Sequence, residues 1–338
     1  MKPLVIPIFI SHQGCRHRCI FCDQYTITGN ARVESEPVTP EAVQTTIRFW
    51  LQRPRKEKKQ RVQVAFYGGS FTGLPQQRQR ELLESVNPFI RNKEVDFIRI
   101  STRPDYIDET IAGFLKEHSV SIVELGIQSL HQDVLDASIR GHSVLQAQEA
   151  IKLLKGKGFI VGAQLMCGLP ADNCARVMAT ARKTAELEPD FVRIYPVLVI
   201  KGSGLEKLYR DRKYKPLSLA GAVALSCRMK AVFDEQNIRV VRLGLQSSAE
   251  LAEKVVAGPY HPAFGELVIA RNLYKKTRKI LQSEQGRQGK YLHIAAADES
   301  AFRGPDNTNI KRLTVLGLME NVEVVFNKDQ ARNTVLVC

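Results

Sequence analysis

Three cysteines near the start of the chain are the residues whose type and spacing most clearly predict chemistry. Cys15, Cys19 and Cys22 follow the pattern C-x-x-x-C-x-x-C, with Phe21 directly before the last of them. Cysteine thiolates are the usual protein ligands of iron–sulfur clusters, and three of them can hold three irons of a [4Fe–4S] cluster. Because no fourth cysteine lies nearby in the sequence, the fourth iron would stay open, which favours catalysis over electron storage.

A zinc site is the main alternative for these cysteines. Structural zinc takes four ligands, typically from paired spacings, and His12 or His17 could supply the fourth. A disulfide role is disfavoured, because the chain has 7 cysteines, an odd number, and no signal peptide is recognised at its start. We therefore expect reduced cysteines in a cytoplasmic protein. The other four cysteines form no close pair and predict no second cluster.

Six short apolar segments, separated by helical segments, predict the framework that positions the cysteines. The expected strands are residues 5–10, 62–67, 97–101, 121–126, 159–166 and 191–196. The expected helices between them are residues 40–51, 76–89, 107–117, 144–155 and 173–186. Apolar strands that alternate with helices imply a parallel sheet with right-handed crossovers, so the fold class is α/β, as an open sheet or a barrel.

Residues suited to ligand binding follow these strands where each one ends. In barrels of parallel strands, functional groups gather at the carboxyl ends of the strands. The residues at those ends are the three cysteines, Gly68 and Gly69, Ser101, Gln128 and Gly168. A glycine pair at a strand end lets the backbone approach a ligand closely, because no Cβ stands in the way. The sequence therefore predicts one site at a single edge of the sheet.

The last third of the chain follows a different pattern. Residues 217–235 and 263–281 predict long helices, residues 238–243 and 291–295 predict strands, and residues 322–326 and 334–338 predict a hairpin. We expect a core barrel over residues 1–200, its helix–strand completion over 201–257, and a small C-terminal α/β extension over 258–338.

A strong excess of positive charge points to a polyanionic partner. The net charge is +14, with a sequence pI near 9.5. The basic residues gather in three groups, at Arg53–Arg61, Lys207–Lys215 and Lys275–Lys279. Each group alone is typical of a solvated surface, but together they favour a nucleic acid, RNA or DNA, as a partner. No apolar run is long enough to cross a membrane, so no membrane partner is expected.

The cysteine pattern resembles the cluster loop of the radical S-adenosylmethionine (SAM) superfamily. The resemblance implies a [4Fe–4S] cluster on Cys15, Cys19 and Cys22 and SAM bound at the open iron. Gly68 and Gly69 are similar to the family's glycine motif, whose backbone holds the amino group of SAM. The family form often ends in Glu, whereas Ser70 and Phe71 follow here.

Further SAM-binding residues are implied by the branch of this superfamily that contains oxygen-independent coproporphyrinogen III oxidase. There, a Gly-x-Gln on the fourth strand is followed twelve residues later by an Arg, and Gln128 and Arg140 match this spacing. The resemblance implies that the Gln contacts the ribose of SAM and the Arg its carboxylate. Ser101 and Gln164 are the other expected SAM contacts, although the branch carries an Asp at the place of Gln164.

The longest resemblance is to the radical SAM core of the catalytic subunit of Elongator. The similar stretches are residues 68–72, 101–107, 124–129, 140–142, 193–196 and 258–266. The Elongator subunit spaces its first two cysteines more widely and carries an N-terminal RNA-binding segment and a C-terminal acetyltransferase domain. The residues after 258 are too few for that domain, so we expect a relative without it.

The sequence therefore predicts a radical SAM enzyme on a partial (β/α)6 barrel of the TIM type. A reduced cluster would cleave SAM to a 5′-deoxyadenosyl radical, with an electron donor such as flavodoxin or ferredoxin. A tRNA or another RNA is the expected substrate, and no catalytic residue is singled out. Two alternatives stay open at this point: a porphyrin-like or other small anionic substrate, and a non-catalytic iron–sulfur or RNA-binding protein.

Overall fold

The computed structural model describes residues 3–10, 12–15, 18–23, 37–54, 60–283 and 291–338. These residues divide into two compact units, one of residues 1–217 with 232–260 and one of residues 218–231 with 261–338. The domain boundaries expected from the sequence stay a prediction. None of the helices in the described ranges is long and apolar enough to cross a membrane.

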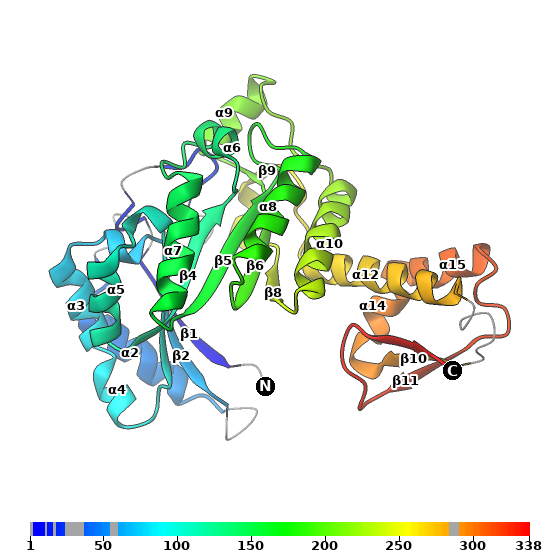
Figure 1. The fold of residues 1–338 in the computed structure, drawn as a ribbon, viewed down its shortest axis with the longest axis horizontal. Helices are drawn as coiled ribbons and strands as arrows, with labels where there is room; N and C mark the ends of the chain where they lie inside the picture. Colours follow the sequence, from blue (N-terminus) through cyan, green and yellow to red (C-terminus); the bar gives the residue numbers. More distant parts are fainter. Residues whose placement is uncertain (1–2, 11, 16–17, 24–36, 55–59, 284–290) are drawn as a thin grey trace. The chain divides into compact units, whose positions relative to one another are not determined.

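The first unit is built on a sheet of seven parallel strands. In spatial order the strands are β1 (Leu4–Phe9), β2 (Val62–Tyr67), β3 (Phe97–Thr102), β4 (Val120–Gln128), β5 (Ile160–Cys167), β6 (Phe191–Pro196) and β8 (Arg239–Leu243). The sheet curls around its concave face (Figure 1). The prediction of a partial barrel is confirmed, and β8, predicted over residues 238–243, is its seventh strand.

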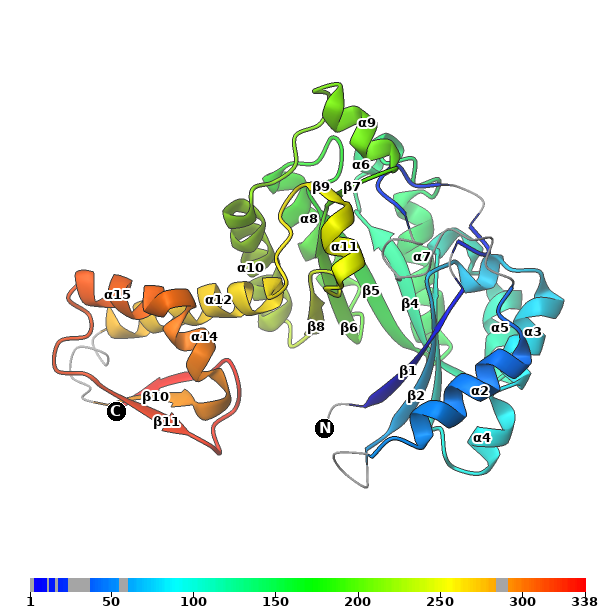
Figure 2. The ribbon, with the colours of Figure 1, turned by 180° about the vertical axis from the view of Figure 1, so that it is seen from behind.

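Helices cover the convex face of this sheet. They are α2 (Pro40–Leu51), α3 (Gln76–Glu84), α4 (Asn87–Arg91), α5 (Glu109–Glu117), α6 (Gln132–Ala137), α7 (Val144–Gly156) and α8 (Cys174–Glu186). Helix α7 lies against β4 and β5, and α2 lies against β1 (Figures 1 and 2). The N-caps follow from the sequence: Thr39 accepts a hydrogen bond from the Ala42 amide, and Ser143 begins α7 with a capping box.

Several shorter elements complete the first unit. They are α9 (Gly204–Arg210), α11 (Ala249–Lys254) and the two-stranded sheet of β7 (Val199–Ile200) and β9 (Val255–Ala257). The prediction of one continuous helix over residues 76–89 is wrong. The structure has two helices there, because α3 ends at Glu84 and α4 begins at Asn87. Pro88 lies in the first turn of α4, where its missing N–H leaves no hydrogen bond unmade.

The second unit contains part of α10 (Leu219–Glu235) and three further helices, α12 (Phe264–Leu281), α14 (Glu299–Arg303) and α15 (Thr308–Val315). It also has its own sheet. The strands of that sheet are β10 (Tyr291–Ala295), β11 (Glu323–Asn327) and β12 (Val335–Val337). The predicted hairpin of the last two strands is wrong: β10 lies between them, parallel to β11 and antiparallel to β12. Leu292 and Ile294 of β10 are fully buried in the apolar core of this unit, which explains its central place.

Candidate functional site

The loop that carries the cysteines is fixed to the end of the neighbouring strand. The amide of His12 donates to Gly68 O at 2.9 Å, and the amide of Ser70 donates to Gln13 O at 3.0 Å. A Cβ at Gly69 would lie 2.3 Å from Gln13 O, so only glycine allows this approach. Gly69 therefore supports the loop directly, and its expected contact with SAM stays a prediction.

The other side of the loop is held by elements from later in the chain. The amide of Ile20 donates to Ser138 O at 3.1 Å, and Ile20 O accepts from the amide of Leu205 at 2.7 Å. Phe21 packs against an apolar cluster that includes Val134 and Leu169. The backbone between the second and third cysteines is thus fixed by three separate segments of the first unit.

All three cysteines are free thiols in partly or fully buried positions. Cys19 is buried, and Cys15 and Cys22 are half-buried. Burial raises the pKa of the Cys15 and Cys22 thiols, an effect that the charge of Arg140 opposes. A coordinated metal deprotonates a thiol outright, so these positions suit metal ligands better than free thiolates.

A single metal ion was the alternative occupant of the cysteine loop. Among the described residues, no group of three or more His, Cys, Asp or Glu side chains is arranged to hold a metal ion, the three cysteines included. His17, one of the two histidines considered for zinc, lies outside the described residues. The assignment of the cysteines as cluster ligands stays a prediction.

Arg140 reaches the cysteine loop from the segment after α6. Its Nη1 lies 3.3 Å from Cys19 Sγ, and its Nη2 donates to Gly126 O at 2.6 Å. A Cβ at Gly126 would lie 2.7 Å from Arg140 Nη2 and 3.0 Å from Gln128 Nε2. Gly126 therefore leaves the space in which the two side chains expected to bind SAM come together.

Gln128 ends its strand in an unusual conformation. The pairing of β4 with β5 shifts register between Gly126 and Gln128, and Gln128 has a φ of 67°. A residue other than glycine in this region costs about 1–3 kcal/mol and is kept where the surrounding structure holds it, as at many ligand-binding sites. The side chain is 4% exposed, yet its Oε1 has no hydrogen-bond partner among the described residues.

Several buried polar atoms of the predicted SAM site have no hydrogen-bond partner, which indicates whether a polar ligand would fit this site. Arg140 Nε and Arg103 Nη1 are also buried, and neither has a partner in the described part of the chain. A buried polar atom without a partner is destabilising, so a polar ligand would satisfy several such atoms at once. The donors and acceptors present suit the carboxylate and ribose of SAM, and the thiols beside them suit an iron–sulfur cluster.

The remaining predicted residues lie on the same face of the sheet. Ser101 is half-buried and pairs in register with Glu124. Gln164 is half-buried and pairs in register with Gly126 on one side and Arg193 on the other. Both are close in the sheet to the predicted SAM site, and their contacts with SAM stay predictions.

Several buried charged or ionisable residues near this site, which lie in the strand-end and family-like stretches of the sequence, were given no role from the sequence. Arg103 is 2% exposed and forms a bidentate ion pair with Asp105, at 2.9 Å for both contacts. Burial, and then the charges of Arg140 and Arg103, lower the pKa of His142 to about 3, so its ring is neutral at physiological pH. Charged residues in the middle of apolar strands, such as Arg99 and Glu124, were the sequence signal that could have revealed such buried charges.

Comparisons with known proteins show the family. The model of the radical SAM superfamily matches residues 9–183, and that of the radical SAM C-terminal domain matches residues 189–275. The chain belongs to the radical SAM superfamily. It is an enzyme of this class, with a [4Fe–4S] cluster and SAM as its cofactors.

Individual relatives include proteins of RNA modification. The chain is 29% identical to an uncharacterized protein of Methanocaldococcus jannaschii, over 67% of this chain and 70% of that protein. It is 28% identical to Elongator complex protein 3 of Danio rerio, over 75% of this chain and 52% of that protein. It is 26% identical to the tRNA uridine(34) acetyltransferase of M. jannaschii, over 78% and 54% respectively. The chain thus spans about half the length of the latter two relatives.

The fold is shared with a solved structure of the same kind. The archaeal Elp3 of Methanocaldococcus infernus, with residues 1–46 deleted, superposes with a TM-score of 0.61 and 22% identity. The superposition covers 82% of this chain and 64% of that chain. The expected Elongator-like architecture is confirmed.

Proposed function

We propose that this enzyme modifies RNA, and tRNA in particular, by radical SAM chemistry. Cys15, Cys19 and Cys22 hold the cluster, and Gln128 and Arg140 orient SAM beside it. When bound, the cluster supplies the electron that cleaves SAM to methionine and the 5′-deoxyadenosyl radical. The observation that carries the proposal is the buried Arg140 side chain, 3.3 Å from Cys19 Sγ and beside Gln128 at Gly126, with polar atoms of both side chains that no described residue satisfies.

The chain's own residues position the cofactors and limit access to them. Arg140 can bind the SAM carboxylate through two parallel N–H···O hydrogen bonds, a bidentate geometry that guanidinium groups provide. The apolar packing of Phe21 excludes water from the back of the cysteine loop. An external donor such as flavodoxin or ferredoxin is part of the proposal, and so is a cytoplasmic location, where the seven cysteines would stay reduced.

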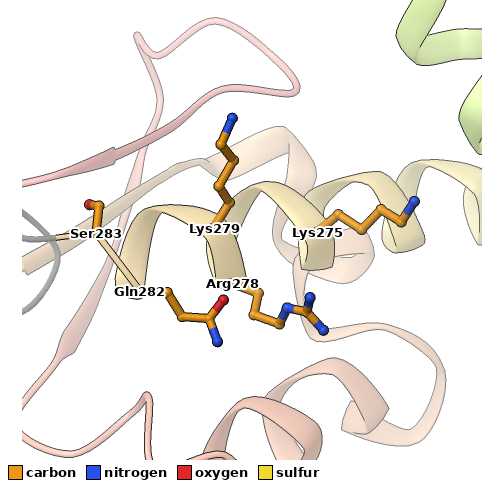
Figure 3. Close-up of a pocket in the computed structure, with 5 residues that line it drawn as sticks. All are labelled: Lys275, Arg278, Lys279, Gln282 and Ser283. Atoms are coloured by element: carbon orange, nitrogen blue, oxygen red, sulfur yellow. The ribbon is translucent and has the colours of Figure 1, made fainter.

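A basic surface on the second unit supports RNA as the substrate. Lys275, Arg278 and Lys279 of α12 are exposed and line an open hollow of about 440 Å³ with Gln282 and Ser283 (Figure 3). No ion pair within the described residues involves the three cations. In Figure 3 their side chains spread apart, Lys279 to one side of the helix and Arg278 to the other. Such divergent cations suit an extended phosphate backbone better than a single phosphate.

The first unit offers exposed basic and aromatic groups as well. Arg53 lies 4.5 Å from the ring centre of Phe49, which is 55% exposed, and 4.8 Å from that of Trp50. Exposed aromatic rings beside an arginine can stack on unpaired bases. Arg61 of the same basic group lies 5.4 Å from the ring centre of Phe97, and residues 55–59 of the group lie outside the described residues.

Reversing the charges on α12 should weaken tRNA binding and its salt dependence. In the triple variant K275E/R278E/K279E, we expect the slope of log affinity against log salt concentration to fall by about two, because each lost phosphate contact releases fewer counterions. Gel retardation of a tRNA transcript at several salt concentrations measures this slope. The matched control is K152E/R182E/K183E, which changes the net charge equally on the exposed faces of α7 and α8.

Two results would contradict the RNA proposal. The wild-type protein would show no retardation of tRNA even at low salt, or the control triple variant would lose affinity as much as the α12 variant. The second result would mean that overall charge alone, without a defined surface, attracts the RNA.

Adding one methyl group at Gly126 should weaken SAM binding without unfolding the protein. In Gly126→Ala the new Cβ must displace the flexible ends of Arg140 and Gln128, while the strand itself is undisturbed. Loss of charge-assisted hydrogen bonds predicts an affinity for SAM about tenfold weaker. Equilibrium dialysis of SAM with cluster-loaded protein measures the affinity, and urea unfolding measures the stability.

Two helical glycines provide the control for this substitution. Apart from the adjoining residues and the backbone of the same helix, no described atom lies within 4 Å of a Cβ built at Gly113 or Gly156. Their replacement by alanine should leave SAM binding unchanged and stabilise the protein by about 0.5–1 kcal/mol each. Wild-type SAM affinity in Gly126→Ala would show that Arg140 and Gln128 do not contact SAM.

A further inference from the structure

One of the three basic groups of the sequence has no role in the proposed function, and it begins directly beside the cysteine loop. The group Lys207–Lys215 carries five cations against one acid. It starts within α9, whose first turn contacts the loop between the second and third cysteines. A Cβ at Gly204 would lie 2.8 Å from Ile20 Cγ1, and the amide of Leu205 donates to Ile20 O at 2.7 Å.

The segment that carries these cations is anchored at both ends. Leu205 is fully buried and belongs to the same apolar cluster as Tyr214, against which Phe21 of the cysteine loop packs. The hydroxyl of Tyr214 donates to Gly168 O at 2.5 Å, and its amide donates to Leu208 O at 3.2 Å. The basic segment therefore holds a fixed position relative to the cysteine loop.

Most cations of this segment are available to a partner. Arg210 is ion-paired with Glu206, at 2.6 Å between Nη2 and Oε1. Lys207, Arg212 and Lys213 are exposed, and no ion pair within the described residues involves them. We name these three residues the α9 cations. Exposed cations without a counter-charge create a positive field that attracts an acidic partner and speeds its association.

Exposed aliphatic side chains stand beside the same point of the cysteine loop. The amide of Ile20 donates to Ser138 O at 3.1 Å, and the next residue, Ile139, is 53% exposed. Leu145, in the first turn of α7, is 60% exposed. Helices α6 and α9 lie side by side at this edge of the sheet (Figures 1 and 2). Apolar and cationic groups thus flank the segment that links the cysteines.

Ile139 occupies a backbone position that glycine normally takes. Its φ is 51°, and its amide donates to Asp136 O at 3.0 Å, while the amide of Arg140 donates to Leu135 O at 2.9 Å. These two hydrogen bonds form the Schellman motif that ends α6, in which the left-handed residue is usually glycine. A β-branched residue with a positive φ is strained. Strain at an exposed side chain is not offset by packing within the chain, which indicates a contact with a partner.

The charge and the apolar groups together indicate a protein of negative charge. A phosphate backbone would pair with the α9 cations but would gain nothing from aliphatic side chains, whereas protein interfaces combine apolar contacts with a polar rim. Ile20, which both flanking segments contact, directly follows Cys19 in the chain. Electron transfer between proteins requires a short distance, and redox partners meet through small interfaces that charge steers.

We propose that the α9 cations and Ile139 dock an acidic one-electron carrier protein, which reduces the cluster across this face. This inference rests on the proposed function, in which Cys15, Cys19 and Cys22 hold the cluster. One electron passes from the carrier's reduced flavin or iron–sulfur centre to the cluster. The carrier is oxidised by one electron, the cluster is reduced by one, and no bond forms or breaks.

Reversing the α9 cations tests the docking surface. Cluster-loaded enzyme is mixed with a photoreduced acidic flavodoxin, and the visible absorbance of the cluster is followed by stopped flow. In K207E/R212E/K213E we expect the second-order rate constant at low salt to fall about tenfold or more, and the difference to shrink at high salt. The matched control K152E/R182E/K183E carries the same net charge and should stay within about twofold of the wild type.

Replacing Ile139 by glycine tests the apolar part of the surface without endangering the fold. Because glycine suits this position, Ile139→Gly should be at least as stable as the wild type in urea unfolding. The flavodoxin concentration that gives half the maximal reduction rate should rise about fivefold. The control is Val315→Gly at the end of α15, where the side chain is 87% exposed and distant in sequence from the cysteines. A flavodoxin dependence as in the wild type would remove Ile139 from the surface.

Separate reductants and ligands distinguish the possible failures. Excess dithionite needs no docking and should reduce the cluster of every variant to the same extent. If no cluster loads, or if dithionite and SAM give no 5′-deoxyadenosine, the proposed function fails. If dithionite reduces the wild-type cluster and flavodoxin does not, or if the α9 variant reacts with flavodoxin as fast as its control, the docking surface is overturned. An unchanged flavodoxin rate with weaker tRNA retardation would assign the α9 cations to RNA instead.

Discussion

Changing Cys19 to alanine should abolish cluster binding and reduce 5′-deoxyadenosine formation to background. Cys19 is the most buried of the three thiols, at 8% exposure, and its Sγ lies next to Arg140. Two remaining cysteines would leave a second iron without a protein ligand, so the cluster would be lost or degraded. Iron and sulfide analysis after anaerobic reconstitution measures the cluster, and chromatography of reactions with SAM and dithionite measures the product.

Two exposed cysteines provide matched controls for this prediction. Cys174 begins α8 and Cys338 ends the chain, and both are exposed. Their alanine variants should load iron and cleave SAM as the wild type does. A full iron content together with wild-type product formation in Cys19→Ala would remove this residue from the ligand set. Loss of the cluster in a control variant would show that thiol loss in general disturbs the reconstitution.

Changing Glu124 to alanine should destabilise the protein by about 3–5 kcal/mol, because it leaves two guanidinium groups in the sheet interior without their carboxylate. Arg99 is 8% exposed as a side chain and Arg193 is 20% exposed, so water can compensate only in part. The variant Glu124→Gln keeps the shape and loses the charge, and it should fall between alanine and wild type. Urea unfolding of the metal-free protein, followed by circular dichroism, measures the difference.

An exposed glutamate makes the control for the loss of a carboxylate. Glu186 ends α8 at the surface, and its replacement by alanine should change stability by less than about 0.5 kcal/mol. Equal stability of the Glu124 and Glu186 variants would contradict the interpretation that the ion network carries a large share of the sheet's stability.

Local patterns in the sequence were enough to predict the sheet and many of its helices. Buried parallel strands read as continuous apolar runs, and residues 62–67 match β2 at both ends. The N-cap at Thr39 was equally readable, because its side chain bonds an amide only three residues away. Signals of this kind need no knowledge of distant contacts.

Such local patterns could not predict which strands and side chains far apart in the sequence contact each other. Strand β10 is central because its Leu292 and Ile294 side chains are both buried. The sequence instead suggested a hairpin of β11 and β12, because these two strands follow each other in the chain. Arg193 and Tyr67 are 126 residues apart, and only the curl of the sheet brings them together. Family resemblance indicated Gln128 and Arg140, but no pattern showed that Gly126 clears the space between them.

The open form of the barrel leaves two outer strands whose free sides could recruit strands of other molecules. Within the described residues, β1 pairs with β2 alone and β8 with β6 alone. Unpaired edges promote aggregation unless proline or charge interrupts them. Pro7 removes one N–H donor from β1, and Arg239 and Arg242 place charge along β8. The chain can therefore keep its sheet open while discouraging the edge-to-edge association of its own copies.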